Sequence, residues 1–387
     1  MAISRDNIIK DFLSLSVIDR ESYAEREFAD ALAGRLEEMG FSVTEDDAGS
    51  RIGGNAGNIY AFLKGNIGGD PVLFACHMDT VCPGCGKKAV VEGDVIRSDG
   101  AAVLGGDDLT GIIPVLHGIR EAIESGAPRR DIEIIFTVAE EVFTKGAKAF
   151  DFSRVKAKDA YILDVDGEPG EAALSAPSII QFNAVIHGRA AHAGFACEEG
   201  RNAIQAMTTA VSQMIQGRPD PDSTFNVGTI NGGRATNIVS ETCSIFCEAR
   251  SFSHARCEEI VEGNRQILQK AADDFGCELE FDSFVPVRAM ETDENAPVVG
   301  RFISACESAG IKPVLKRTFG VSDGNYFQVV GIPALVIATG MCNVHSTQEF
   351  CYISNMEANA RLVAAIVSQT EYPDRFAQVN MEMNGDV

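Results

Sequence analysis

The chain has 387 residues, of which 45% are hydrophobic, and a mean hydropathy of +0.01, as expected for a globular protein large enough to hold two hydrophobic cores. Its 33 Lys and Arg residues against 56 Asp and Glu residues give a formal net charge of −23, which disfavours binding to nucleic acid or to anionic membranes. The first residues contain no apolar signal segment and no stretch approaches a membrane span, so we expect a cytoplasmic protein.

Helices and strands are predicted to alternate along the first part of the chain. Hydrophobic residues recur at helical spacing over residues 6–17 and 23–39, and Gly40 marks the end of the second helix. Apolar segments bounded by turn-forming residues predict strands at 41–44, 58–63 and 71–75. The alternation continues to about Ala173 and is typical of a mostly parallel sheet covered by helices. We therefore expect an α/β domain that begins with residues 1–176.

The middle third changes character and predicts an inserted α+β sandwich domain at 177–290. Mostly alternating polar and apolar residues predict strands at 179–187, 224–230, 242–250 and 278–287. Amphipathic helices are predicted at 202–215 and 257–275. After the insertion the helix and strand patterns resume, so residues 291–387 are expected to complete the first domain, with a polar, frayed tail after Tyr372.

Acidic and His residues recur where segments of the α/β domain begin or end. They are His77, Asp79, Asp107, Asp108, Glu140, Glu141, Asp164, Asp166 and His345. In open α/β sheets, ligands bind outside the carboxyl ends of the strands. Carboxylates and imidazoles gathered there would suit one or two divalent ions, most often zinc. His77 and Asp79 point the same way on a strand, so Asp79 can accept a hydrogen bond from the second ring nitrogen of His77.

Each of these residues also has a plainer interpretation. Asp107 and Asp108 fit an acidic pair at the start of a helix, where the helix dipole favours negative charge. Glu140 and Glu141 fit a solvated loop, but two adjacent carboxylates would then repel each other for no gain, and a nearby dication removes that cost. The metal-site interpretation therefore depends on these residues taken together.

The cysteines do not indicate a disulfide framework. Their number, 11, is odd, and several lie within apolar segments, which favours free thiols in a reducing compartment. Cys82 and Cys85 form a C-x-x-C pair, but without a second pair this spacing is a weak signal for zinc or redox chemistry. We expect a loop whose turn is made by the intervening Pro and Gly.

Seven longer motifs resemble the cocatalytic dizinc exopeptidases, a family that includes peptidase T, carboxypeptidase G and aminoacylases. They are HMDTV at 77–81, LGGDDLTG at 104–111, TVAEEVF at 137–143, GRAAHAG at 188–194, GTINGGRATNIV at 228–239, EARSF at 248–252 and NVHSTQEF at 343–350. The motifs occur in the family's order over nearly the whole chain, and the resemblance is closest to the peptidase T-like branch. It implies a zinc-exopeptidase-like fold with an inserted lid that also dimerises.

The resemblance implies a ligand set for two divalent ions, which would be zinc, with manganese or cobalt as alternatives. Asp107 resembles the carboxylate that bridges the two ions. His77 and Asp164 resemble the other ligands of one ion, and Glu141 and His345 those of the second.

Other roles follow from the same resemblance. Glu140 resembles the general base, and Asp79 resembles the carboxylate that supports His77. Asp166 is an alternative to Asp164 as a ligand, although the place of Asp164 directly behind an apolar segment favours Asp164. Leu109 departs from the family, which usually has Lys after the bridging motif.

The lid residues His192, Asn237 and Arg250 resemble substrate-binding groups, and the family's equivalent of His192 reaches the active site of the partner subunit. Arg250 also has a plain alternative as a surface ion pair in an acidic protein. The sequence therefore predicts a homodimeric metallopeptidase, most simply an aminopeptidase acting on short peptides. A deacylase of N-acyl amino acids or related small amides and a catalytically silent metal-binding protein are the alternatives. Glu140, kept beside the predicted ligands, argues against the silent protein.

Overall fold

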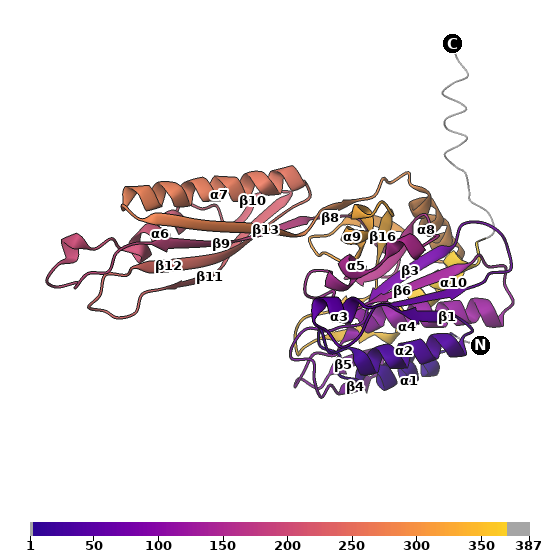
Figure 1. The fold of residues 1–387 in the computed structure, drawn as a ribbon. Coiled ribbons are helices and arrows are strands. Elements are labelled where there is room, and N and C mark those ends of the chain that lie inside the picture. The colour runs from indigo at the N-terminus through magenta and orange to yellow at the C-terminus, as the bar shows by residue number, and fades with distance from the viewer. Residues whose placement is uncertain (1–2, 370–387) are drawn as a thin grey trace, which may run out of the picture. The chain divides into compact units, whose positions relative to one another are not determined.

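The computed structural model describes residues 3–369, and the tail predicted after Tyr372 lies outside them. The chain forms two compact units (Figure 1). One comprises the residues up to Ser175 together with those from Met290 onward, and the other is the continuous segment Ala176–Ala289. Each unit has its own hydrophobic core. No helix within residues 3–369 is long and apolar enough to cross a membrane.

The first unit is built on a nine-stranded sheet whose central strands run parallel. The strand order is β1-β2-β6-β3-β7-β16-β8-β14, and β15 pairs with β8. The bounds are Ser42–Glu45 (β1), Ile59–Leu63 (β2), Val72–His77 (β3), Ile132–Thr137 (β6), Ala160–Val165 (β7), Glu171–Ala176 (β8), Met290–Glu291 (β14), Val314–Arg317 (β15) and Ala334–Ala338 (β16). β3 is parallel to β6 and β7, and β16 is parallel to β7. The carboxyl ends of these four strands therefore meet at one edge of the sheet.

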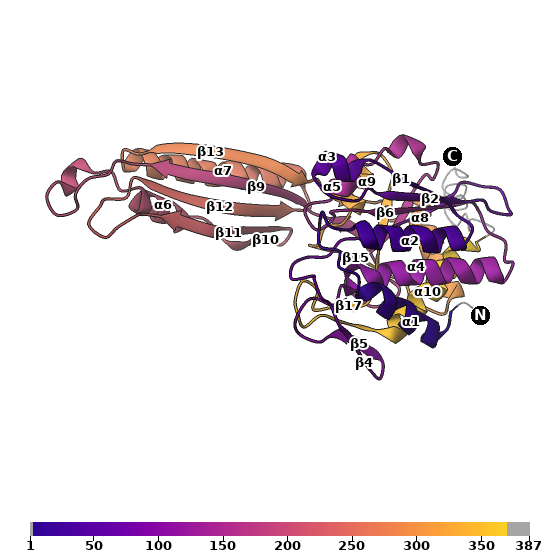
Figure 2. The same ribbon diagram turned by 60° about the horizontal axis from the view of Figure 1, so that its bottom comes forward.

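Helices cover this sheet, as its composition requires. Every residue of β3, β6 and β16 is buried, and strands that are apolar on both faces need cover on both faces. The helices are Arg5–Ser16 (α1), Arg26–Glu38 (α2), Ala48–Ile52 (α3), Gly106–Glu124 (α4), Lys145–Ala149 (α5), Pro297–Ser308 (α8), Gly324–Val329 (α9) and Ile353–Val367 (α10). α1, α4 and α10 pack against one another (Figure 2). This arrangement confirms the predicted α/β fold class.

The start of α4 is not the regular helix start that an acidic pair suggests. Asp107 has a ψ of 103° and Asp108 a φ of −115°, so neither residue has helical dihedral angles. Both side chains are buried, and Oδ2 of Asp108 accepts a hydrogen bond from the backbone N–H of His77 at 3.3 Å. The acidic pair therefore lies at a break in the helix, facing the end of β3 rather than solvent.

A small four-stranded sheet, which the sequence did not predict, supports the segment around His345. Its order is β17-β18-β5-β4. The bounds are Ala89–Glu92 (β4), Val95–Ser98 (β5), Met341–Cys342 (β17) and Phe350–Tyr352 (β18). Strands this short carry too few residues to show a period of two in the sequence.

The second unit is a five-stranded antiparallel sheet with two helices packed on it, which confirms the predicted α+β insertion. Its strand order is β10-β11-β12-β9-β13. The bounds are Ser178–His187 (β9), Gly217–Asp220 (β10), Ser223–Gly232 (β11), Thr242–Ser251 (β12), Glu278–Val287 (β13), Ala203–Val211 (α6) and His254–Asp274 (α7). α7 begins three residues earlier than predicted, because the Ser253 hydroxyl accepts from the backbone N–H of Arg256 and caps the helix.

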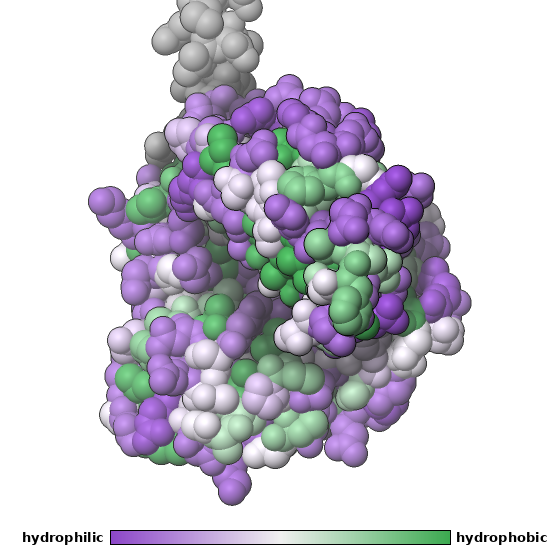
Figure 3. Space-filling model, turned by 90° about the vertical axis from the view of Figure 1, so that its left-hand side faces the viewer, coloured by the Kyte–Doolittle hydropathy of each residue, from purple (hydrophilic) through white to green (hydrophobic). Residues whose placement is uncertain are grey.

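The two faces of this sheet differ in burial. Residues such as Phe182, Ile245 and Cys247 form a core with the helices. Phe246 and Phe284 are partly exposed, and their rings stack with centroids 6.3 Å apart. The face of the molecule drawn in Figure 3 shows patches of hydrophobic residues among hydrophilic ones.

Candidate active site

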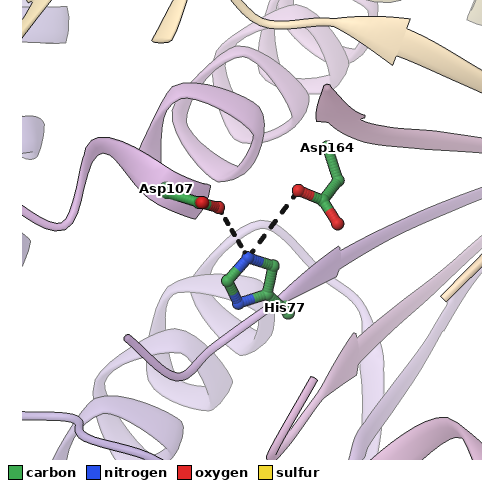
Figure 4. Close-up of side chains that lie close together, drawn as sticks. All are labelled: His77, Asp107 and Asp164. Carbon is green, nitrogen blue, oxygen red and sulfur yellow. Dashed lines mark hydrogen bonds and ion pairs between the residues drawn. The ribbon is translucent and has the colours of Figure 1, made fainter. Parts of the chain in front are cut away.

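The ends of β3 and β7 bring the first group of candidate ligands together. His77 is the last residue of β3, Asp164 lies near the end of β7, and Asp107 lies at the start of α4. Nε2 of His77 is 2.8 Å from Oδ1 of Asp107 and 3.8 Å from Oδ1 of Asp164 (Figure 4). The side chain of His77 is buried, so its ring is held with one nitrogen facing both carboxylates.

A second group uses the other oxygen of Asp107. Nε2 of His345 lies 3.3 Å from Oδ2 of Asp107 and 3.0 Å from Oε2 of Glu141. In each group the possible ligand atoms lie within 4.8 Å of one another. Oε1 of Glu141 is buried and has no hydrogen-bond partner among the described residues. Asp107 thus belongs to both groups with one oxygen facing each, as a bridging carboxylate would.

The electrostatics of the two groups fit divalent cations. Burial alone would lower the pKa of His77, but nearby carboxylates, Asp164 first, raise that pKa well above its ordinary value. Burial and neighbouring carboxylates raise the pKa of Asp164 well above its usual range. Hydrogen bonds to Asp107 and Glu141 raise the pKa of His345 to about 10. These side chains offer oxygen and nitrogen ligands without thiolate, a set that suits zinc, manganese or cobalt.

Asp79 connects the end of β3 to the glutamate pair. Its Oδ1 accepts from the backbone N–H of Glu140 at 2.9 Å, and its Oδ2 accepts from that of Glu141 at 3.2 Å. Oδ2 also accepts from the hydroxyl of Ser22 at 2.7 Å, and Oδ1 lies 3.4 Å from Nδ1 of His77. One fully buried carboxylate therefore positions a candidate ligand and the two glutamates together.

Glu140 lies beside both ligand groups and belongs to neither. Its carboxyl group is buried, and burial with added charge from Asp323 and Glu141 raises its pKa well above its usual range. A cavity of about 380 Å³ opens at this point. Acidic residues and His345 line one part of it, and its apolar lining residues are Val165, Phe319, Val321, Val336, Met341 and Val344. Glu140 is therefore placed to exchange a proton with a molecule in the cavity.

The structure separates the two Asp residues that competed for one ligand position. Asp164 belongs to the group with His77 and Asp107, whereas Asp166 belongs to neither group and is exposed. Both residues line the cavity.

Arg20 is a buried cation that the sequence did not bring to attention. Its Nη1 donates to the backbone oxygen of Met78 at 2.9 Å, and its Nη2 donates to that of Gly105 at 2.5 Å. Its side chain is fully buried. Arg20 therefore ties the segment after His77 to the segment before Asp107, and a single Arg in a loop carries no pattern that could have predicted this.

Glu349 is a second buried residue that organises the site. Its Oε2 accepts from the backbone N–H groups of Leu104 at 2.7 Å and Gly105 at 2.9 Å, and its Oε1 accepts from that of Asp107 at 2.9 Å. Glu349 follows His345 by four residues, within one of the motifs noted above. It therefore holds the backbone of the shared ligand against the segment that carries His345.

We expect Glu349→Gln to weaken metal binding by a factor of about 10–100, the usual effect of losing a partner that orients ligands. An amide has one acceptor oxygen, so at least one of the three N–H groups would face an NH₂ group instead. Chelator competition on the purified variant measures the change. Glu357→Gln, which removes the same charge from the surface of α10, is the matched control. Unchanged affinity in Glu349→Gln would contradict the role given to Glu349.

In the second unit, His192 and Asn237 lie on paired segments. The backbone N–H of Ala193 donates to the carbonyl of Asn237 at 3.0 Å. The N–H of Gly194 donates to Nδ1 of His192 at 3.1 Å, which leaves the proton of the neutral ring on Nε2. The ring of Phe195 stacks on His192 with centroids 4.3 Å apart. His192 is thus held with an exposed N–H that can donate.

Arg250 lies at the other end of the same sheet. It pairs with Ile179 at the start of β9, whereas the segment of His192 follows the end of β9 at His187. These ends are separated by roughly 25 Å of strand. Nε of Arg250 donates to Oε1 of Glu248 at 2.7 Å. One chain therefore does not bring His192 and Arg250 together within this unit.

The second unit matches a known domain. The model of the peptidase dimerisation domain, from the M20 peptidases, matches residues 174–275. Over the whole chain, the uncharacterized protein YqjE of Bacillus subtilis is 34% identical across 367 residues, which are 95% of this chain and 99% of that protein.

Two solved structures match both units. The aminopeptidase PepT from Bacillus cereus is 35% identical with a TM-score of 0.89, and a tripeptidase from Staphylococcus aureus is 28% identical with a TM-score of 0.91. Each match covers 95% of this chain and 99% of the other chain. The chain therefore belongs to the M20 peptidase family, in its peptidase T-like branch, and is a hydrolase of peptide bonds.

Proposed function

We propose that the protein is a metal-dependent aminopeptidase that removes the first residue of short peptides. The observation that carries this proposal is the pair of ligand groups sharing Asp107, with the unassigned carboxylate of Glu140 beside them in one cavity. The aminopeptidase and tripeptidase among the solved relatives support the choice of substrate.

In this proposal the first unit is the catalytic unit and binds two divalent ions, zinc by preference. Asp107 would contribute to both sites, His77 and Asp164 would hold one ion with it, and Glu141 and His345 would hold the other. When bound, such ions lower the pKa of a water molecule and polarise the carbonyl of the scissile bond. Asp79 positions His77 and the backbones of Glu140 and Glu141 relative to these two sites.

Glu140 acts as the general base. Its carboxylate accepts the proton of the attacking water and passes it to the nitrogen of the departing amine. Its place in the cavity, outside both ligand groups, leaves its oxygens free for this transfer. Burial raises the pKa of the Glu140 carboxyl above its usual range, which makes its carboxylate a stronger base than an exposed glutamate.

The second unit acts as a lid and as the dimerisation domain of a cytoplasmic homodimer. His192 donates a hydrogen bond from its Nε2–H to the oxygen of the carbonyl under attack, in the active site of the partner subunit, and keeps its proton. The N–H of Gly194 at Nδ1 supports this role, because it keeps the neutral ring in the donating tautomer. Asn237 and Arg250 hold the substrate, Arg250 through the paired N–H groups of its guanidinium.

The test compares peptides that differ only at their amino terminus. Di- and tripeptides with a free amino group, their N-acetylated forms and N-acetyl amino acids are offered to enzyme reconstituted with zinc, manganese or cobalt. We expect hydrolysis of the free peptides to be faster by at least about tenfold in kcat/KM, the effect of one charged hydrogen bond. Faster hydrolysis of the N-acetyl compounds would replace this proposal with a deacylase.

A further inference from the structure

Asp166 is the acidic residue of the cavity for which the proposed chemistry has no task. The titratable residues that line the cavity are Asp107, Glu140, Glu141, Asp164, Asp166 and His345. Five of them are ligands or the general base in the proposed function. Asp166 belongs to neither ligand group, and it is an exposed residue of the cavity lining.

The surroundings of Asp166 leave its carboxylate open. Its backbone oxygen accepts a hydrogen bond from Nζ of Lys316 at 2.7 Å, and the same Nζ lies 2.8 Å from Oε2 of Glu171. Among residues 3–369, no side chain forms a hydrogen bond or ion pair with the carboxylate of Asp166. No Lys or Arg lines the cavity in the described part of the chain. The nearby ammonium group of Lys316 is bound to the backbone oxygen of Asp166 and to Glu171, so the Asp166 carboxylate can still attract a positively charged partner.

The spacing along the chain places Asp166 at a suitable reach. Asp164 lies near the end of β7, Asp166 directly follows this strand, and both line the cavity. Two residues of extended chain span about 6.6 Å. In an amino-terminal residue the nitrogen lies about 2.5 Å from the carbonyl carbon, two bonds away. When the scissile carbonyl is held at the ligand group of Asp164, the α-ammonium group is therefore within reach of a carboxylate two residues along the chain.

We propose that the carboxylate of Asp166 binds the α-ammonium group of the peptide and selects substrates with a free amino terminus. This inference rests on the proposed aminopeptidase function and assigns its amino-terminal specificity to one residue. It also gives separate tasks to the two Asp residues at the end of β7, Asp164 as a metal ligand and Asp166 as a substrate-binding residue.

The test pairs a substitution with a change in the substrate. A tripeptide and its des-amino analogue, in which hydrogen replaces the α-amino group, are assayed with the wild-type protein, Asp166→Asn and Asp166→Glu. We expect Asp166→Asn to lower kcat/KM for the tripeptide by about tenfold or more and to leave the des-amino analogue almost unchanged, because a charged hydrogen bond is lost with the tripeptide alone. Asp166→Glu should recover part of the loss, and elemental analysis should find the wild-type metal content in every variant.

Glu168→Gln is the matched control, since Glu168 is an exposed carboxylate two residues away that does not line the cavity. It should leave the kinetics with both substrates unchanged. Equal losses with both substrates in Asp166→Asn, no loss with either, or a lower metal content would overturn the role of Asp166. If the wild-type protein itself does not prefer the free amino group, the proposed function fails, which separates that result from a failure of this inference.

Discussion

Glu140→Gln is expected to retain about two metal ions per chain and to lower kcat by a factor on the order of 10²–10⁴, the usual contribution of a general base. The amide has nearly the shape of the carboxylate but cannot accept and return a proton at neutral pH. The residue belongs to neither ligand group, so its loss should leave metal affinity intact. Elemental analysis and steady-state kinetics on the same preparation measure both quantities.

Glu141→Gln is the matched variant, because it makes the same chemical change one residue along the chain. Oε2 of Glu141 lies 3.0 Å from Nε2 of His345, inside the second ligand group. This variant should lose metal from that site, and its activity should recover in part when excess metal is added. If Glu140→Gln loses metal and Glu141→Gln keeps it, the two roles are reversed.

Mixing two inactive variants, Glu140→Ala and His192→Ala, is expected to restore roughly a quarter of the wild-type activity. In a two-fold symmetric dimer, each subunit would contribute its His192 to the active site of its partner. After co-refolding equal amounts, about half of the dimers are mixed, and each has one site with an intact Glu140 and an intact His192 from the partner. The structure motivates the test, because His192 and Arg250 lie at opposite ends of β9 and β12 and would serve one site only by coming from two chains.

The control for this experiment mixes Glu140→Ala with Glu141→Ala. Both substitutions damage the catalytic unit of their own chain, so no combination of subunits yields an intact site and no activity should return. A mass tag on one variant establishes that mixed dimers form. If tagged mixed dimers are present and the first mixture stays inactive, or if the protein is monomeric at the assay concentration, His192 does not act across the dimer.

The ends of apolar segments predicted which residues gather near the site, and the resemblance to the dizinc exopeptidases predicted which of these residues form the ligand groups. His77 is the last residue of an all-buried strand, and a parallel sheet gathers such ends at one edge. The same argument applies to residues far apart in the chain, such as His77 and His345, and needs no knowledge of the distance between them in space. It also indicated Asp164 over Asp166, and Asp164 is the one that lies in the first ligand group.

The residues that hold the ligands in place could not be predicted in this way. Arg20 and Glu349 hydrogen-bond to backbone groups. Every residue has a backbone carbonyl and nearly every residue a backbone N–H, so the sequence does not show which of them a distant side chain will contact. Ala139, just before Glu140, has a φ of 51°. A glycine at this position would have indicated such a backbone conformation, whereas an alanine does not. The break in the helix at Asp107 and the short strands of the small sheet were not predicted either, because tertiary contacts determine them and local periodicity does not.

The position of the insertion determines the order in which the molecule can be assembled during synthesis. Ala176–Ala289 is one continuous segment whose strands pair only with one another, so it can fold while the ribosome is still adding the rest of the chain. β16 lies between β7 and β8 in the large sheet, so that sheet stays open until residues 334–338 have emerged. His345 and Glu349 emerge later still. A nascent chain can therefore complete the unit that matches the dimerisation domain first, and it gains its full set of candidate metal ligands only after His345 has emerged.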